Sequence, residues 1–218
     1  MKLIQNRRTL VAGLAAAVAA FTTGARPMHA QSASGGFSPV RHDADRWMDE
    51  LRGQHRVFVD SASRAGGQDA VLFANNLFNT NEAAYLIAPA DLAIVVCFRH
   101  ASTPYGYNDA MWAKYGSFFS QRLELAQPVT ANPVNVGGPV DGNRRTLASL
   151  VEKGAQIAIC ANATRGMAGR IASSTGTSPE AVFKELTANP VPNGRFVPAG
   201  VVAATRAQEY GYSLLSCG

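Results

Sequence analysis

Short apolar runs alternate along the chain with longer segments whose apolar residues recur at helical spacing. The run "LAIVVCF" (92–98) is uninterrupted, and "AQIAIC" (155–160) is nearly so. Runs of this kind are typical of strands that are buried on both faces of a sheet. The sequence predicts further strands at "RVFVDSAS" (56–63), "RFVPAGV" (195–201) and "YSLLSC" (212–217).

Helical segments separate these predicted strands. Asn108 is suited to cap one of them, and Ser178, followed by a proline at the first helical position, is suited to cap another. Strands that alternate with helices indicate an α/β fold: a single domain with a mostly parallel sheet, flanking helices and flavodoxin-like layering. The predicted helices span residues 69–86, 108–125, 144–153, 179–189 and 203–211.

The first thirty residues have the pattern of an export signal. Residues 1–8 are basic, and the apolar segment 10–21 is too short to cross a membrane as a helix. The pair Arg7-Arg8 resembles a bacterial twin-arginine signal, which predicts a periplasmic or secreted protein. There are two alternatives: an ordinary secretory signal in which the arginine pair occurs by chance, or a retained membrane anchor.

The rest of the chain divides into two predicted parts. Residues 31–55 are expected to form a flexible lead with a short helix, and 56–218 the α/β domain. Four of the 20 Lys and Arg residues lie in the predicted signal, which leaves 16 basic residues against 15 acidic ones. Because the mature chain is nearly neutral, we expect no nucleic-acid partner and no membrane association.

Two of the three cysteines end predicted strands. Cys97 and Cys160 close the runs 92–98 and 155–160, and a polar loop is expected after each, 161–165 in the second case. Ligand sites of parallel α/β sheets lie beyond the carboxyl ends of strands. Cys160 is therefore a working thiol, a partner of Cys97 or Cys217 in a disulfide, or an inert buried residue. Cys97 is expected to pack in the core, and no role is predicted for Cys217.

The segments "LVEKGAQIAICANATRGM" (150–167) and "VPNGRFVPAGVVAATRAQEYGYSLL" (191–215) resemble the DsrE/DsrF-like family. The resemblance covers about residues 57–218. The family consists of small α/β proteins linked to sulfur relay and sulfur oxidation. The resemblance implies a homo-oligomer, and a persulfide on the cysteine that matches Cys160, with Arg165 in the following loop. The segment 99–116 looks like a signature of an exported, mostly uncharacterised branch.

Two strand ends carry the candidate chemistry. A thiolate at Cys160 would be favoured by a helix N-terminus and by positive charge from Arg165. His100 follows the other strand, and with Asp109 to orient it, it would act as a base; the alternative is a loop histidine bonded to the backbone. Arg99 and Asn162 are predicted to support the same site.

No cofactor or metal is predicted. Cys97 and His100 have C-x-x-H spacing and could join Cys160, but a second dense pair of ligands is missing. The predicted function is a thiol- or persulfide-based sulfur-handling or redox protein, whose partner is a small sulfur-containing ligand or a thiol protein. The alternative is a non-catalytic protein that binds a small ligand or serves in assembly.

Overall fold

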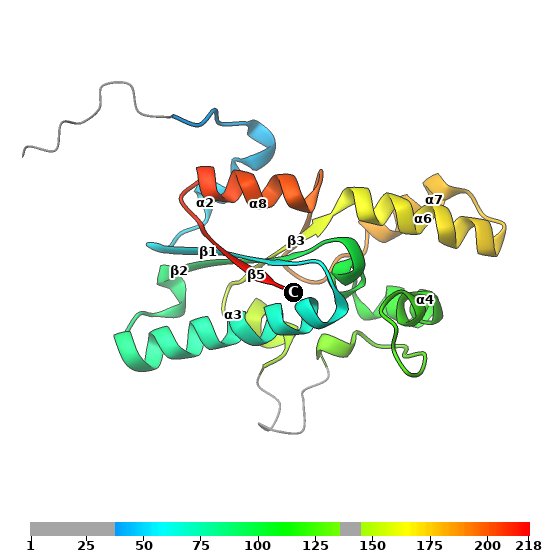
Figure 1. The fold of residues 1–218 in the computed structure, drawn as a ribbon, viewed down its shortest axis with the longest axis horizontal. Helices are drawn as coiled ribbons and strands as arrows, with labels where there is room; N and C mark the ends of the chain where they lie inside the picture. The colour runs from blue at the N-terminus through cyan, green and yellow to red at the C-terminus, as the bar shows by residue number, and fades with distance from the viewer. Residues whose placement is uncertain (1–37, 136–144) are drawn as a thin grey trace, which may run out of the picture. The chain divides into compact units, whose positions relative to one another are not determined.

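The computed structural model of the chain describes residues 38–135 and 145–218, and it confirms the predicted α/β class (Figure 1). The described residues form a five-stranded sheet in the order β4-β3-β2-β1-β5, in which all neighbours are parallel. The strands are β1 (His55–Ser61), β2 (Leu92–Phe98), β3 (Gln156–Cys160), β4 (Gly194–Val197) and β5 (Ser213–Cys217).

Helices cover both faces of this sheet, which explains why β2 is buried along its whole length. α3 (Arg64–Tyr85) packs on β1, β2 and β5 from one side, and α8 (Gly200–Glu209) packs on β1, β2 and β3 from the other (Figure 1). Alternate strand residues therefore enter two separate cores. Val59 and Val96 lie in the α3 core, whereas Phe58 and Cys97 lie in the α8 core.

Cap residues fix where several helices begin. Asn108 caps α4 (Asp109–Arg122) and Ser178 caps α7 (Pro179–Thr187), as predicted, with side-chain oxygens that accept from Met111 N and Ala181 N. The other α-helices of the described chain are α2 (Trp47–Glu50), α5 (Leu147–Glu152) and α6 (Ala161–Thr175). The 3-10 helices are η1 (Asp43–Asp45), η2 (Pro89–Asp91), η3 (His100–Gly106) and η4 (Pro133–Asn135).

The compact unit begins at Arg41, ahead of the boundary that the sequence predicted at residue 56. Trp47 and Met48 of α2 are buried in the α8 core, so this short helix packs against the sheet. The predicted signal, residues 1–30, lies outside the described residues. Over 38–135 and 145–218, no helix has the length and hydrophobicity that crossing a bilayer requires.

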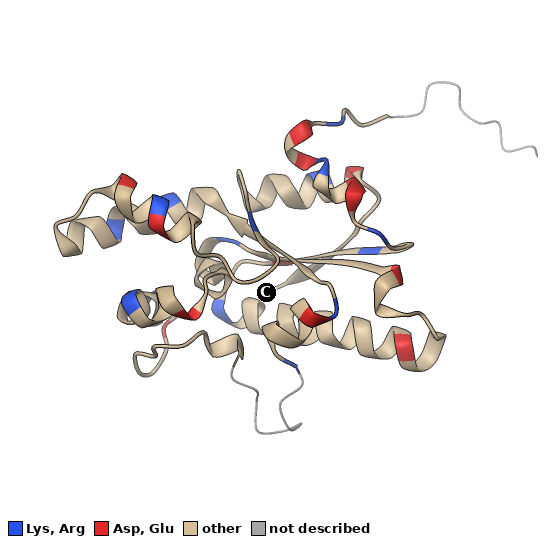
Figure 2. Cartoon of the chain, turned by 180° about the vertical axis from the view of Figure 1, so that it is seen from behind, with Lys and Arg blue, Asp and Glu red and all other residues tan. Residues whose placement is uncertain are grey.

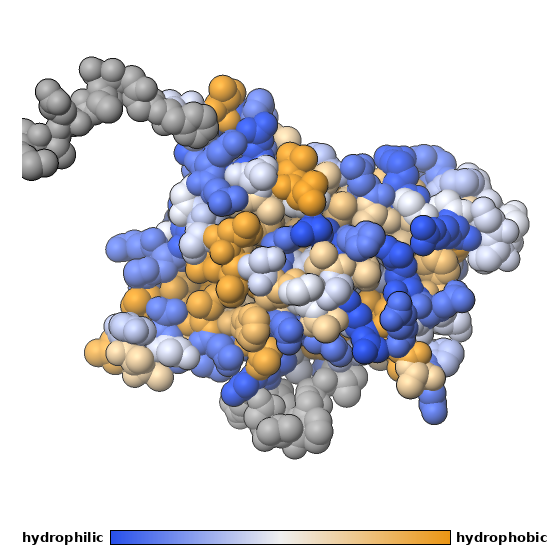
Figure 3. All heavy atoms as spheres, viewed as in Figure 1, coloured by the Kyte–Doolittle hydropathy of each residue, from blue (hydrophilic) through white to orange (hydrophobic). Residues whose placement is uncertain are grey.

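Two of the large apolar residues that are exposed in the described chain belong to β5 and to α3, which packs on it. Leu214 of β5 is 42% exposed and Phe73 of α3 is 37% exposed. Figure 3 shows apolar surface gathered over this part of the molecule. Figure 2 shows, by contrast, basic and acidic residues interspersed over the chain.

Helices α4 and α7 are tied together by one carboxylate. Glu185 of α7 accepts from Lys114 Nζ at 2.5 Å and from Tyr115 OH at 2.6 Å. Both contacts favour the ionised carboxylate and lower the pKa of Glu185, the lysine contact having the larger effect.

Replacing Glu185 with Gln tests this tie. Because the pKa of Glu185 is lower in the folded chain, its stabilising effect exists above the unfolded pKa and disappears as the pH falls through the folded pKa. We expect Glu185→Gln to lower the melting temperature by roughly 1 to 3 °C at pH 7, as is usual for a largely solvated pair. Thermal melts of both proteins from pH 7 to pH 3 should converge at the acidic end. A constant difference at every pH would contradict this account.

Candidate functional site

A pocket of about 360 Å³ lies where β2 and β3 leave the sheet, beside the first turns of α6 and α8. It is at the carboxyl edge of the parallel strands, where α/β folds place their ligand sites. Four of the six predicted site residues line it. The lining residues are Arg99, His100, Cys160, Asn162, Ala163, Ala199, Gly200 and Val201.

Cys160 is the last residue of β3 and also the N-cap of α6. The loop expected over 161–165 is wrong, because the helix begins at the residue after the cysteine. Sγ of Cys160 accepts a hydrogen bond from Ala163 N at 3.4 Å, and the residue is 7% exposed. A 15-residue helix thus directs the positive end of its dipole at this sulfur and stabilises negative charge there.

None of the three cysteines forms a disulfide, so Cys160 is bonded neither to Cys97 nor to Cys217. Cys97 is fully buried; its pKa is raised by loss of solvation and, to a smaller extent, by the negative charges of Asp60 and Cys160. Burial also raises the pKa of Cys217 to about 11. Both of these thiols are therefore held protonated, and Cys97 packs in the core as predicted.

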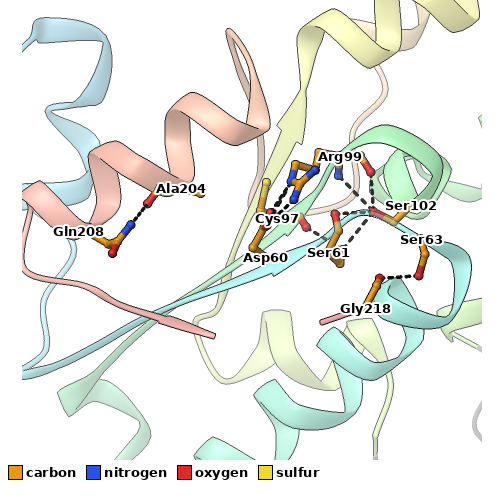
Figure 4. Close-up of polar contacts among 9 residues, drawn as sticks. All are labelled: Asp60, Ser61, Ser63, Cys97, Arg99, Ser102, Ala204, Gln208 and Gly218. Atoms are coloured by element: carbon orange, nitrogen blue, oxygen red, sulfur yellow. Dashed lines mark hydrogen bonds and ion pairs between the residues drawn. The ribbon is translucent and has the colours of Figure 1, made fainter. Parts of the chain in front are cut away.

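Arg99 is fixed by an acidic residue that the sequence analysis did not identify. Asp60, at the end of β1 and 5% exposed, accepts from Arg99 Nε at 2.8 Å and from Nη2 at 2.7 Å, a two-pronged contact shown in Figure 4. The contact raises the pKa of Arg99. A carboxylate placed in a run of β-branched and aromatic residues is the signal that could have revealed Asp60.

α8 approaches this arginine closely because its first residue is a glycine. A Cβ on Gly200 would lie 2.6 Å from Arg99 Cβ and 2.9 Å from Arg99 Cδ, well inside van der Waals contact. Gly200 therefore lets the start of α8 form one wall of the pocket, directly against the arginine stem. This wall, made by Ala199, Gly200 and Val201, was also absent from the residues that the sequence predicted.

A second group of contacts holds the strand exits below Arg99. Ser102 Oγ lies 3.0 Å from Ser61 O and 2.9 Å from Arg99 O, so its one hydroxyl proton is shared between these two carbonyl oxygens, and it accepts from Arg99 N at 3.1 Å. Ser61 Oγ donates to Cys97 O at 2.7 Å (Figure 4). These bonds satisfy buried backbone groups at the ends of β1 and β2 and fix the turn that carries His100.

His100 lies at the mouth of the pocket but does not meet Asp109. The histidine is exposed and has a left-handed backbone, with φ of 54°. Asp109 faces another pocket, which it lines with Asn108, and its Oδ1 accepts from Asn132 N at 2.8 Å. The predicted base and its orienting carboxylate are thus not brought together.

Arg165 is directed away from Cys160. Its side chain is 63% exposed, its guanidinium lies 4.0 Å over the Phe183 ring, and it forms an ion pair with Glu180 at 3.8 Å. Asn162, in contrast, lines the pocket from the first turn of α6. Arg99 is therefore the arginine that contributes charge at Cys160, and Arg165 instead joins α6 to α7.

No cluster of three or more His, Cys, Asp or Glu residues is positioned to hold a metal ion within 38–135 and 145–218. No model of a known protein family matches the sequence, and no curated protein matches it either.

Replacing Asp60 with Asn removes the charge that holds Arg99. We expect a loss of about 1 to 3 kcal/mol in unfolding free energy, because the arginine keeps a weaker partner while a quarter of its side chain stays exposed. Asp43→Asn, in the exposed pair with Arg46, should change stability by less than about 0.5 kcal/mol. Urea denaturation measures both values. An equal loss of unfolding free energy in the two variants would show that the buried pair stabilises the fold no more than the exposed pair does.

His100→Gly and Leu86→Gly separate backbone strain from side-chain function. Both residues have left-handed φ values, 54° and 56°, and Leu86 is a 90% exposed helix cap that does not line the pocket. Glycine adopts this conformation freely, so each variant should gain about 1 kcal/mol in stability. A melting temperature that falls in His100→Gly alone would instead mean that the imidazole supports the fold.

Proposed function

We propose that the chain carries sulfane sulfur as a persulfide on Cys160. The observation that carries this proposal is the position of Cys160, which lines the pocket and lies at the N-terminus of a long helix. Loss of solvation raises the pKa of Cys97 and the pKa of Cys217. Because the thiolate is the nucleophile, the chemistry belongs to Cys160.

The sulfur is acquired by simple exchange. The Cys160 thiolate attacks one sulfur of an inorganic polysulfide and forms a new S–S bond with it. The bond between that sulfur and the rest of the polysulfide breaks, and the shortened polysulfide leaves with the electron pair. The total charge is unchanged, and no separate oxidant is required. An acceptor thiolate then attacks the outer sulfur, and Cys160 departs as a thiolate.

The neighbours of Cys160 have distinct parts in this proposal. Arg99, held by Asp60, presents a positive charge to the anionic donor and to the persulfide anion. Asn162 offers an amide donor from α6. His100, at the exposed mouth of the pocket, offers a ring N–H donor to the departing polysulfide.

Mass spectrometry tests the proposal directly. The reduced full-length chain, treated with inorganic polysulfide, should gain the mass of one sulfur atom on the peptide that contains Cys160. Cys160→Ser should lose this adduct and remain folded, because serine is itself a good N-cap. Cys217→Ser, which replaces another buried thiol, is the matched control and should keep the adduct. Uptake that persists in Cys160→Ser would overturn the proposal.

One observation favours the alternative, a protein that binds a small ligand without catalysis. Cys160 is only 7% exposed and its sulfur already caps α6, which is a structural role in itself. In that case the pocket of about 360 Å³ would bind its ligand equally well in Cys160→Ser. The absence of any adduct on the wild-type chain would favour this function over sulfur transfer.

Export by the twin-arginine route and assembly into a homo-oligomer stay predictions. The interspersed charges of the described chain support the expectation that nucleic acid is not a partner (Figure 2).

A further inference from the structure

A further pocket, of about 310 Å³, contains two arginines from different helices. Arg122 ends α4, and Arg170 lies in α6. The other lining residues are Phe118, Gln121 and Glu124. Arg170 is eight residues beyond Asn162, or about 12 Å along the helix, so this pocket is separate from the one at Cys160.

Neither guanidinium has a protein partner among the described residues. The other arginines of α6 and of the Cys160 pocket differ in this respect: Arg165 pairs with Glu180, and Arg99 with Asp60. Nε of Arg122 is moreover buried and donates to no acceptor in the described chain. A buried donor without an acceptor costs free energy, and native structures rarely leave one without a reason.

The two positive charges also act on each other. Burial and the charge of Arg170 both lower the pKa of Arg122, burial having the larger effect. An arginine does not relieve such repulsion by losing its proton, because its pKa stays far above neutrality. An anion bound between the two groups would remove the repulsion and satisfy the free N–H donors.

We propose that the pocket of Arg122 and Arg170 binds a tetrahedral oxyanion, free phosphate or sulfate. Planar guanidinium groups recognise such oxygens through paired N–H donors. The volume of about 310 Å³ accommodates an ion of this size, with Phe118 as an apolar wall. Glu124 lines the same pocket and forms no ion pair with either arginine in the described chain, so the charge available to an anion is one net positive unit.

Bound anion would join the end of α4 to the middle of α6. Since the ligand binds the folded chain and not the unfolded one, it raises stability in proportion to its occupancy. The site thus couples helix packing, well away from Cys160, to the concentration of a small anion.

Titration with inorganic phosphate at constant ionic strength, kept with sodium chloride, tests the site. Melting temperature and calorimetric heat should both saturate for the wild-type chain. Arg170→Gln, at an exposed position, should weaken apparent affinity about tenfold or more, and Arg122→Gln should do the same. Glu124→Gln should tighten binding about two- to fivefold, because it removes a like charge.

Arg165→Gln is the matched control, since it removes an arginine of the same helix that already has a partner. Its phosphate affinity should equal that of the wild type. Sulfate should compete with phosphate, whereas chloride should not. An equal response to phosphate in the wild type and in both Arg122→Gln and Arg170→Gln, or no saturable response in any of them, would overturn the proposal.

Discussion

The candidate site depends on the ion pair between Asp60 and Arg99. These residues leave two neighbouring strands, β1 and β2, and their two-pronged contact fixes the exits of both at the carboxyl edge of the sheet. Buried pairs of this kind are costly to desolvate and are strongly destabilising when only one partner is removed. The pair holds the Arg99 side chain in a fixed place. Its aliphatic stem packs against the start of α8, where Gly200 allows close contact, and its charged end remains beside the pocket of Cys160.

Two cysteines at the ends of adjacent strands have opposite environments for a geometric reason. Cys97 lies one residue before the end of β2, under α8, where burial and Asp60 hold it protonated. Cys160 is the final residue of β3, so its backbone turns directly into α6 and its sulfur meets the helix N-terminus. A difference of one position relative to the strand end separates a core thiol from a candidate nucleophile.

The pattern of apolar runs was sufficient to predict the sheet, because buried parallel strands have an uninterrupted signature. The residues of β2 match the predicted run 92–98 throughout.

The same pattern did not reveal that α6 starts at Ala161, since a cysteine is an unusual N-cap, nor that Trp47 belongs to the core. It placed His100 and Cys160 at one edge correctly, as strand topology requires. The pattern paired His100 with Asp109, and Cys160 with Arg165, because each pair is close in the sequence. In the structure Asp109 instead accepts a hydrogen bond from Asn132 N. Arg165 instead forms an ion pair with Glu180. Asp60 was missed because its role arises from a contact across 39 positions.

The central claim is that Cys160 carries the reactive sulfur in a pocket shaped by Arg99 and α8. A crystal structure of the chain after treatment with polysulfide tests it most directly. The account predicts density for one additional sulfur bonded to Sγ of Cys160, extending into the pocket beside Arg99 and His100. Unmodified Cys160, with the added sulfur on Cys97 or Cys217 or on no cysteine, would contradict it.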